Sequence, residues 1–155
     1  MDSGPVFIPF AINPWDEIVP NLWMGGMYFG PAMTPCAPEN QFDVVISMAG
    51  KGGLGTRVTY PGVLVHSFFI DDGILGLGEL ELVQEAVGLL VGHVAQGRKV
   101  LVRCQMGYNR SGLVVALALL QLDCSPAAEV IELIRAKRGR WALCNEWFVK
   151  LIEDR

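Results

Sequence analysis

The stretch LVRCQMGYNRSGLVVALALL, residues 101–120, decides the fold of this chain. It opens with apolar and β-branched residues that end at Cys104, a pattern typical of a buried strand. After a loop of five residues, Arg110 and Ser111 open a segment that is apolar nearly all round, which predicts a buried helix over 111–122. A buried strand that leads through a tight loop into a buried helix is a unit of α/β domains.

Apolar runs extend this pattern in both directions along the chain. Strands are predicted near Leu22–Met24 and over 42–48, 63–70 and 99–104, and helices over 79–95, 111–122, 127–138 and 146–152. Strands that are separated by helices predict a largely parallel sheet. We therefore expect an α/β fold in a single compact domain, with a central, mostly parallel sheet of about four to five strands and helices on both faces.

Length and composition agree with one folded domain. The chain has 155 residues, against about 150 for a typical domain. Hydrophobic residues make up 52% and charged residues 18%, with a mean hydropathy of +0.38, which excludes a disordered chain. We expect residues 1–155 to form one domain, with 1–14 as an N-terminal extension packed on it.

Charge is unevenly distributed along the chain. The net charge of −4 argues against broad nucleic-acid contacts. Residues 103–155 nevertheless carry 8 basic and 6 acidic side chains, against 4 and 10 in 1–102, so an anion site is expected in the last third. No apolar run is long enough for a membrane span, and the first residues lack a signal peptide's positive region, so we expect a cytoplasmic protein.

Three sources of positive potential converge on the loop after Cys104. Successive backbone N–H groups in a tight loop can bind an oxyanion, and the N-terminus of the following helix adds further N–H groups and a partial positive charge. The guanidinium of Arg110 can hold two phosphate oxygens at once. This potential would favour the thiolate form of Cys104, the nucleophilic form of a cysteine. The pattern therefore predicts phosphoryl transfer to Cys104.

Metal ions and disulfides are not expected. The four cysteines include no Cys-x-x-Cys pair, and the two histidines stand alone in the sequence, which argues against a zinc site. Four cysteines in 155 residues are also too few for a disulfide framework. Whether Cys36, Cys124 or Cys144 approaches Cys104, as redox control would require, is open at this stage.

The string CQMGYNRS resembles the Cys-x5-Arg-Ser/Thr signature of cysteine-dependent phosphatases, specifically the dual-specificity type. The likeness extends over about 140 residues of the chain. It includes WDEIVPNLWMGG (15–26), FDVVISMA (42–49), FFIDDG (68–73) and WALCNEWFVKLIE (141–153).

The resemblance implies a role for each residue of the site. Cys104 would be the nucleophile, Arg110 the phosphate clamp, and Ser111 the hydrogen-bond partner of the sulfur. Asp72 would be the general acid and base, with Asp71 as the alternative. The phosphoryl oxygens would be held by the loop of Gln105, Met106, Gly107, Tyr108, Asn109 and Arg110, with no metal or other cofactor.

Two departures from the family pattern bear on the thiolate and on the substrate. Arg103 stands where the family usually has histidine; it would either favour the thiolate or point away as an ordinary sheet residue. Asn109 replaces the usual Ser or Ala, and NRSG resembles the NRTG of RNA 5′-triphosphatases. A basic cluster of Arg135, Lys137, Arg138 and Arg140 is either a solvated face or a rim for acidic substrates.

The function expected from the resemblance is hydrolysis of phosphate monoesters on proteins. Phosphotyrosine would be a substrate, and a shallow cleft would also admit phosphoserine and phosphothreonine. The alternatives are an RNA 5′-polyphosphate or phosphoinositide phosphatase of the same superfamily, and a non-catalytic module that binds phosphorylated partners. The oligomeric state is left open.

Overall fold

The computed structural model describes residues 7–38, 41–49 and 62–155. In chain order the elements are β1 Trp15–Val19, β2 Leu22–Gly25, β3 Tyr28–Phe29, β4 Thr34–Pro35, β5 Val44–Ser47, β6 Leu64–Ser67, α1 Leu77–Ala95, β7 Val100–Arg103, α2 Arg110–Asp123, α3 Ala127–Arg138 and α4 Glu146–Glu153. Each predicted strand and helix is present, although the 63–70 run forms only a four-residue strand.

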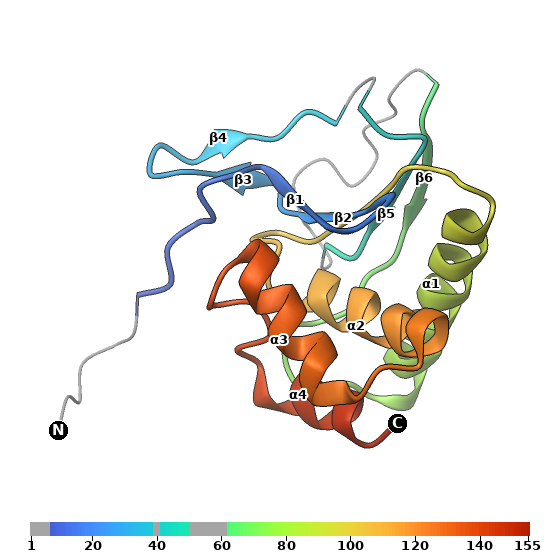
Figure 1. Ribbon diagram of the computed structural model, residues 1–155. Helices are drawn as coiled ribbons and strands as arrows, with labels where there is room; N and C mark the ends of the chain where they lie inside the picture. The colour runs from blue at the N-terminus through green and yellow to red at the C-terminus, as the bar shows by residue number, and fades with distance from the viewer. Residues whose placement is uncertain (1–6, 39–40, 50–61) are drawn as a thin grey trace, which may run out of the picture.

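A five-stranded sheet in the order β1-β2-β7-β5-β6 forms the centre of the domain (Figure 1). The pairs β2–β7, β7–β5 and β5–β6 are parallel, and only β1 runs antiparallel to its neighbour. This confirms the predicted α/β fold with a mostly parallel sheet. The strands β3 and β4, which follow β2 in the chain, form a separate hairpin that projects from the domain.

We expected helices on both faces of the sheet, and the described residues show them on one. All four helices pack on one face, against inward-pointing residues such as Val44, Ile46, Val100 and Val102. The alternate strand residues face the other way and join a second apolar cluster of Phe42, Val45, Leu101, Trp15, Trp23, Val63 and Val65. Aromatic side chains cover this face, which removes the need for a helix there.

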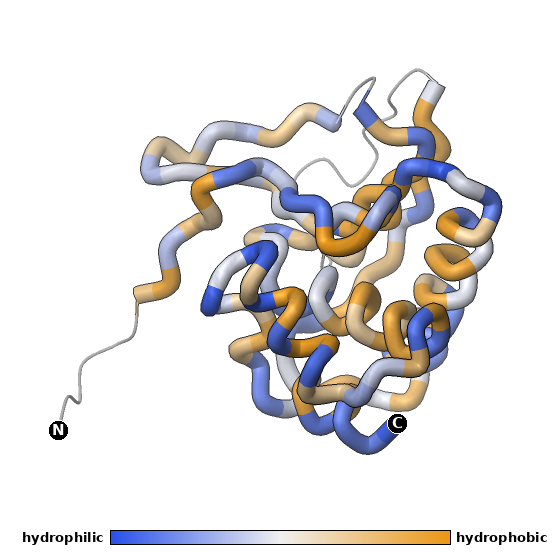
Figure 2. The backbone as a smooth tube through the Cα atoms, in the orientation of Figure 1, coloured by the Kyte–Doolittle hydropathy of each residue, from blue (hydrophilic) through white to orange (hydrophobic). Residues whose placement is uncertain are grey.

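The packing of the helices explains their sequence patterns. Helix α2 lies in the middle of the layer and contacts the other three helices, so it is apolar on all sides. Helix α3 buries one side only, and its backbone in Figure 2 alternates between hydrophilic and hydrophobic colours. None of the helices in the described ranges is long and apolar enough to cross a membrane.

The parallel strands bring the candidate site together at one edge of the sheet. The carboxyl ends of β2, β7 and β6 lead into Gly25–Gly26, Cys104 and the segment that ends at Asp72. Open parallel sheets form their binding sites at this edge. Segments far apart in the sequence therefore converge on Cys104.

The start of the described chain packs along this edge as well. Ala11 is buried in the main core, and the ring of Phe10 contacts Tyr28 edge-on at 6.1 Å between centroids. Residues 1–6 of the predicted extension lie outside the described residues.

Candidate active site

Cys104 and Ser111 lie at the bottom of the site. Cys104 is 3% exposed, and its Sγ lies 3.3 Å from the Oγ of the fully buried Ser111. The two are brought together because Cys104 follows β7 and Ser111 lies in the first turn of α2. A hydroxyl at this distance can donate to a thiolate sulfur.

Between them lies the loop of residues 105–109, and each of its five carbonyl groups accepts a hydrogen bond from a residue outside the loop. Their donors are Met27 N for Gln105 O (2.8 Å), Arg138 Nη2 for Met106 O (3.2 Å), Arg138 Nε for Gly107 O (3.0 Å), Leu143 N for Tyr108 O (3.0 Å) and Leu113 N for Asn109 O (2.8 Å). Within the described part of the chain, the backbone N–H groups of these five residues have no acceptor. The loop thus has its acceptors satisfied and its donors available, which is the arrangement that binds an anion.

The N-terminus of α2 adds further free donors. Asn109 occupies the N-cap position, but its side chain makes no capping hydrogen bond, and no acidic residue lies in the first turn. The first N–H groups of the helix are therefore left for a ligand.

Gly107 allows the loop to pack directly against β2. Its φ of +75° lies in the left-handed region, and a Cβ there would lie 2.4 Å from the carbonyl carbon of Gly25. A Cβ on Gly26 would also come within 2.8 Å of the loop backbone, at Met106. Only glycine fits at these contacts.

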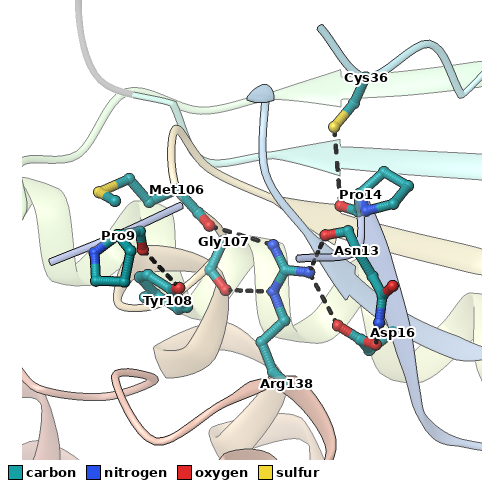
Figure 3. Close-up of polar contacts among 9 residues, drawn as sticks. All are labelled: Pro9, Asn13, Pro14, Asp16, Cys36, Met106, Gly107, Tyr108 and Arg138. Atoms are coloured by element: carbon teal, nitrogen blue, oxygen red, sulfur yellow. Dashed lines mark hydrogen bonds and ion pairs between the residues drawn. The ribbon is translucent and has the colours of Figure 1, made fainter. Parts of the chain in front are cut away.

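Arg138 is buried between the loop and the N-terminal segment (Figure 3). It is 5% exposed, and besides the two loop carbonyls it binds the carboxylate of Asp16 at 2.9 Å and the carbonyl of Asn13 at 2.8 Å. Arg135 likewise binds the carbonyls of Ala142 and Leu143. Neither interpretation of the basic cluster therefore holds for the buried Arg138, whereas Arg135 is exposed and fits a solvated face.

Arg110 has donors left over for a ligand. Its Nη1 donates to the carbonyl of Ile70 at 3.3 Å, while its buried Nε has no hydrogen-bond partner among the described residues. Unpaired buried donors are rare in folded proteins. A bound oxyanion would satisfy this one.

The structure separates the two aspartates. Asp72 faces the loop, where its carboxylate accepts hydrogen bonds from Asn109 Nδ2 at 3.0 Å and Asn145 Nδ2 at 2.8 Å. Both aspartates are exposed, but the contact of Asp71 is a different one, from its backbone N–H to Glu79. Of the two, only Asp72 lines the pocket that contains Cys104.

The side chain of Arg103 lies on the face of the sheet opposite the helices. It shares this face with Leu101, whereas Val102 and Cys104 belong to the core on the helix side. The alternation of the strand thus favours an ordinary sheet position for Arg103.

The other cysteines differ in their distance from the site. Cys144 lines the same pocket as Cys104, and Cys124 lies at the far end of α2. Cys36 donates to Pro14 O, and burial raises the pKa of its thiol against the opposing charges of Arg138 and Arg103.

The pocket over Cys104 has a volume of about 300 Å³. Its lining combines the predicted residues Asp72, Cys104, Gln105, Met106, Tyr108, Asn109 and Arg110 with three that the sequence did not single out for binding, Ile8, Phe10 and Cys144. Burial raises the pKa of Tyr108, so its phenol keeps the proton that it donates to Pro9 O at 2.8 Å. This bond holds the N-terminal segment against the pocket.

Neither a protein-family model nor a curated protein matches this chain. Solved structures do. Human DUSP28 aligns with a TM-score of 0.73 at 17% identity, covering 95% of this chain and 97% of its own. A mouse putative dual specificity phosphatase, solved with zinc tungstate, aligns with a TM-score of 0.70 at 16% identity, covering 99% of this chain and 92% of its own. PTPMT1 in complex with PI(5)P aligns with a TM-score of 0.67 at 21% identity, covering 92% of this chain and 94% of its own. The chain therefore has the fold of these dual-specificity phosphatases.

Proposed function

We propose that this protein is a metal-independent phosphatase that hydrolyses phosphate monoesters through a phosphocysteine on Cys104. One observation carries the proposal. The sulfur of Cys104 lies beside Ser111, in a pocket lined by a loop whose carbonyl groups are all bound from outside. Backbone N–H groups and Arg110 then stabilise the charge that develops on the phosphoryl oxygens.

The reaction takes place in two steps. In the first, the thiolate of Cys104 forms a bond to phosphorus as the ester P–O bond breaks, and Asp72 gives its proton to the leaving oxygen. In the second, the Asp72 carboxylate takes a proton from water, whose oxygen bonds to phosphorus as the S–P bond breaks. Inorganic phosphate leaves, and Ser111 stabilises the departing thiolate.

The lining of the pocket supports a monoester on an apolar group. Ile8, Phe10, Met106 and Tyr108 are apolar or aromatic, and Arg110 is the only cation among the described lining residues. We infer phosphotyrosine on a cytoplasmic protein or peptide as the substrate, with phosphoserine and phosphothreonine as weaker ones.

A phosphoinositide is the second candidate. It is favoured by the likeness to PTPMT1, whose structure was solved with PI(5)P. The local charge opposes it, and opposes an RNA 5′-polyphosphate as well. Arg135 and Arg138 are engaged with backbone carbonyls, so few cations remain near the pocket for additional phosphates.

Hydrolysis of p-nitrophenyl phosphate in the presence of a chelator tests the reaction class. We expect turnover in the wild type and none in Cys104→Ser, with full activity in Cys124→Ser, which removes an exposed thiol far from the pocket. Mass spectrometry of acid-quenched protein should detect a phosphate on Cys104. Binding of a phosphopeptide without turnover would instead indicate a non-catalytic module.

A substrate panel tests the proposed specificity. Phosphotyrosine, phosphoserine and phosphothreonine peptides should be compared with phosphoinositide vesicles and triphosphorylated RNA at equal concentration. The highest kcat/KM is expected for the phosphotyrosine peptide. A preference for the lipid or the RNA would replace our substrate assignment and leave the cysteine chemistry intact.

A further inference from the structure

Asn109 links three separate parts of the site. Its Nδ2 donates to Asp72 Oδ2 at 3.0 Å and lies 3.4 Å from Cys144 Sγ, while its Oδ1 accepts from the backbone N–H of Asn145 at 2.9 Å. Asn109 is 9% exposed, and its side chain does not cap α2. It therefore connects the phosphate-binding loop to the segment that carries the proposed acid.

The amide orientation of Asn109 follows from its partners. A backbone N–H can only donate, so the atom that faces Asn145 N must be the oxygen of the Asn109 amide, and the NH₂ group must face Asp72. The same reasoning applies to Asn145. Its Oδ1 accepts from the backbone N–H groups of Trp147 and Phe148 at the start of α4, so its Nδ2 faces Asp72 Oδ1 at 2.8 Å. Neither amide can turn over without losing a backbone partner.

These two amides hold an aspartate that would otherwise be mobile. Asp72 lies in a connection between β6 and α1 and is exposed to solvent. An exposed side chain explores several rotamers, whereas one hydrogen bond on each carboxylate oxygen favours a single orientation. A fixed orientation beside the loop is what a general acid requires.

We propose that Asn109, together with Asn145, is a positioning residue that holds Asp72 ready for proton transfer to the leaving group. The inference rests on the proposed function, in which Asp72 is the acid. Asn109 acts through Asp72, so its effect should follow the need of the leaving group for a proton. A nitrophenolate leaves without one because its charge is delocalised. An unsubstituted phenolate depends on the acid.

The test compares phenyl phosphate with p-nitrophenyl phosphate on each variant. The ratio of the two kcat/KM values cancels losses of folded protein or of phosphate affinity, which affect both esters alike. General acid–base catalysis contributes about 10²–10⁴-fold, so a misplaced acid in Asn109→Ala should lower the ratio on the order of tenfold. A purely structural role would lower both rates and leave the ratio unchanged.

Two further variants make the test decisive. Cys124→Ala changes a thiol at the far end of α2, outside the pocket, and should keep the wild-type ratio. Asn145→Asp keeps an oxygen for Trp147 N and Phe148 N but replaces the donor that faces Asp72, so it should lower the ratio as Asn109→Ala does. Asn145→Asp decides the question if Asn109→Ala does not fold.

Asp72→Asn separates the two proposals. A lowered ratio in Asp72→Asn but an unchanged ratio in Asn109→Ala and Asn145→Asp overturns the positioning role and leaves the proposed function standing. An unchanged ratio in Asp72→Asn removes Asp72 as the acid and with it the positioning role of Asn109, while the cysteine chemistry is tested separately by Cys104→Ser.

Discussion

The Nε of Arg138 donates a hydrogen bond of 3.0 Å to the carbonyl oxygen of Gly107, 31 residues earlier in the chain. The same guanidinium holds Met106 O and the carboxylate of Asp16, so one buried side chain joins α3, the loop of residues 105–109 and β1 (Figure 3). Because Arg138 holds two of the loop carbonyls, it helps to keep the N–H groups of the loop free for a ligand.

Removing this guanidinium should affect stability and activity together. We expect Arg138→Met to lower the free energy of unfolding by about 3 kcal/mol, because Asp16 and two loop carbonyls lose their donor. Arg138→Lys keeps the positive charge but lacks the planar guanidinium, so it should recover part of the stability and part of the activity. Urea unfolding and kcat/KM for an aryl phosphate check this. Wild-type kcat/KM in Arg138→Met would show that the loop does not depend on this contact.

Gly107→Ala tests the close approach of the loop to β2. Gly97 is the matched control, because its φ of +77° is similar and nothing lies within 4 Å of an added Cβ. Both substitutions should cost about 1–2 kcal/mol for the left-handed conformation. Only Gly107→Ala should lose further stability and weaken inhibition by inorganic phosphate. Equal effects of the two variants would contradict the proposed steric contact.

Ser111→Ala should affect the second step more than the first. Without the Ser111 hydroxyl, 3.3 Å from the Sγ of Cys104, the thiolate is a poorer leaving group and the phosphocysteine should accumulate. Rapid-quench measurements should show a burst of the first product followed by slow turnover. A slow first turnover without a burst would place the hydroxyl's role in the attack instead.

Phe10→Ala tests whether the N-terminal segment contributes to specificity. Loss of an aromatic contact worth about 1 kcal/mol should raise KM for a phosphotyrosine peptide about fivefold. The inhibition constant of inorganic phosphate should stay the same, because phosphate alone does not reach the apolar wall. An equal loss of affinity for the phosphotyrosine peptide and for inorganic phosphate would mean that Phe10 supports the loop and does not contact the substrate.

The histidine pair predicts a loss of stability in acid. Burial lowers the pKa of His93, and the nearby His66 and Arg98 lower it further. Arg98 donates to Nδ1 of His93 at 2.8 Å, which leaves Nε2–H of His93 to donate to His66 Nε2 at 3.2 Å, and both contacts suit the neutral His93 ring.

Because the folded protein resists protonation of His93, the unfolded chain binds more protons as the pH falls below the ordinary histidine pKa of about 6.5. The stabilisation is complete above this pH and is lost below it. Thermal unfolding between about pH 7 and pH 5 should show a falling midpoint, and His93→Asn should flatten that slope. An unchanged slope in His93→Asn would assign the effect to other groups.

The sequence alone was enough to predict the strand–loop–helix unit around Cys104 and the mostly parallel sheet. These features are local, since the period of the apolar residues and the spacing from Cys104 to Arg110 are properties of one continuous segment. Asp71 and Asp72 could also be identified as candidates from the sequence, because the strand before them is parallel to β7 and ends at the same edge of the sheet.

The tertiary structure decided the contacts that join separate segments. From the sequence, Arg138 is expected to face solvent on an amphipathic helix, but the fold places the loop of residues 105–109 against it. Asn109 meets Asp72 across 37 residues of sequence, and nothing local in either segment indicates that pairing. The placement of all four helices on one face of the sheet likewise depends on aromatic side chains covering the other face. Periodicity shows which residues are buried, and only the packed structure shows which of them meet.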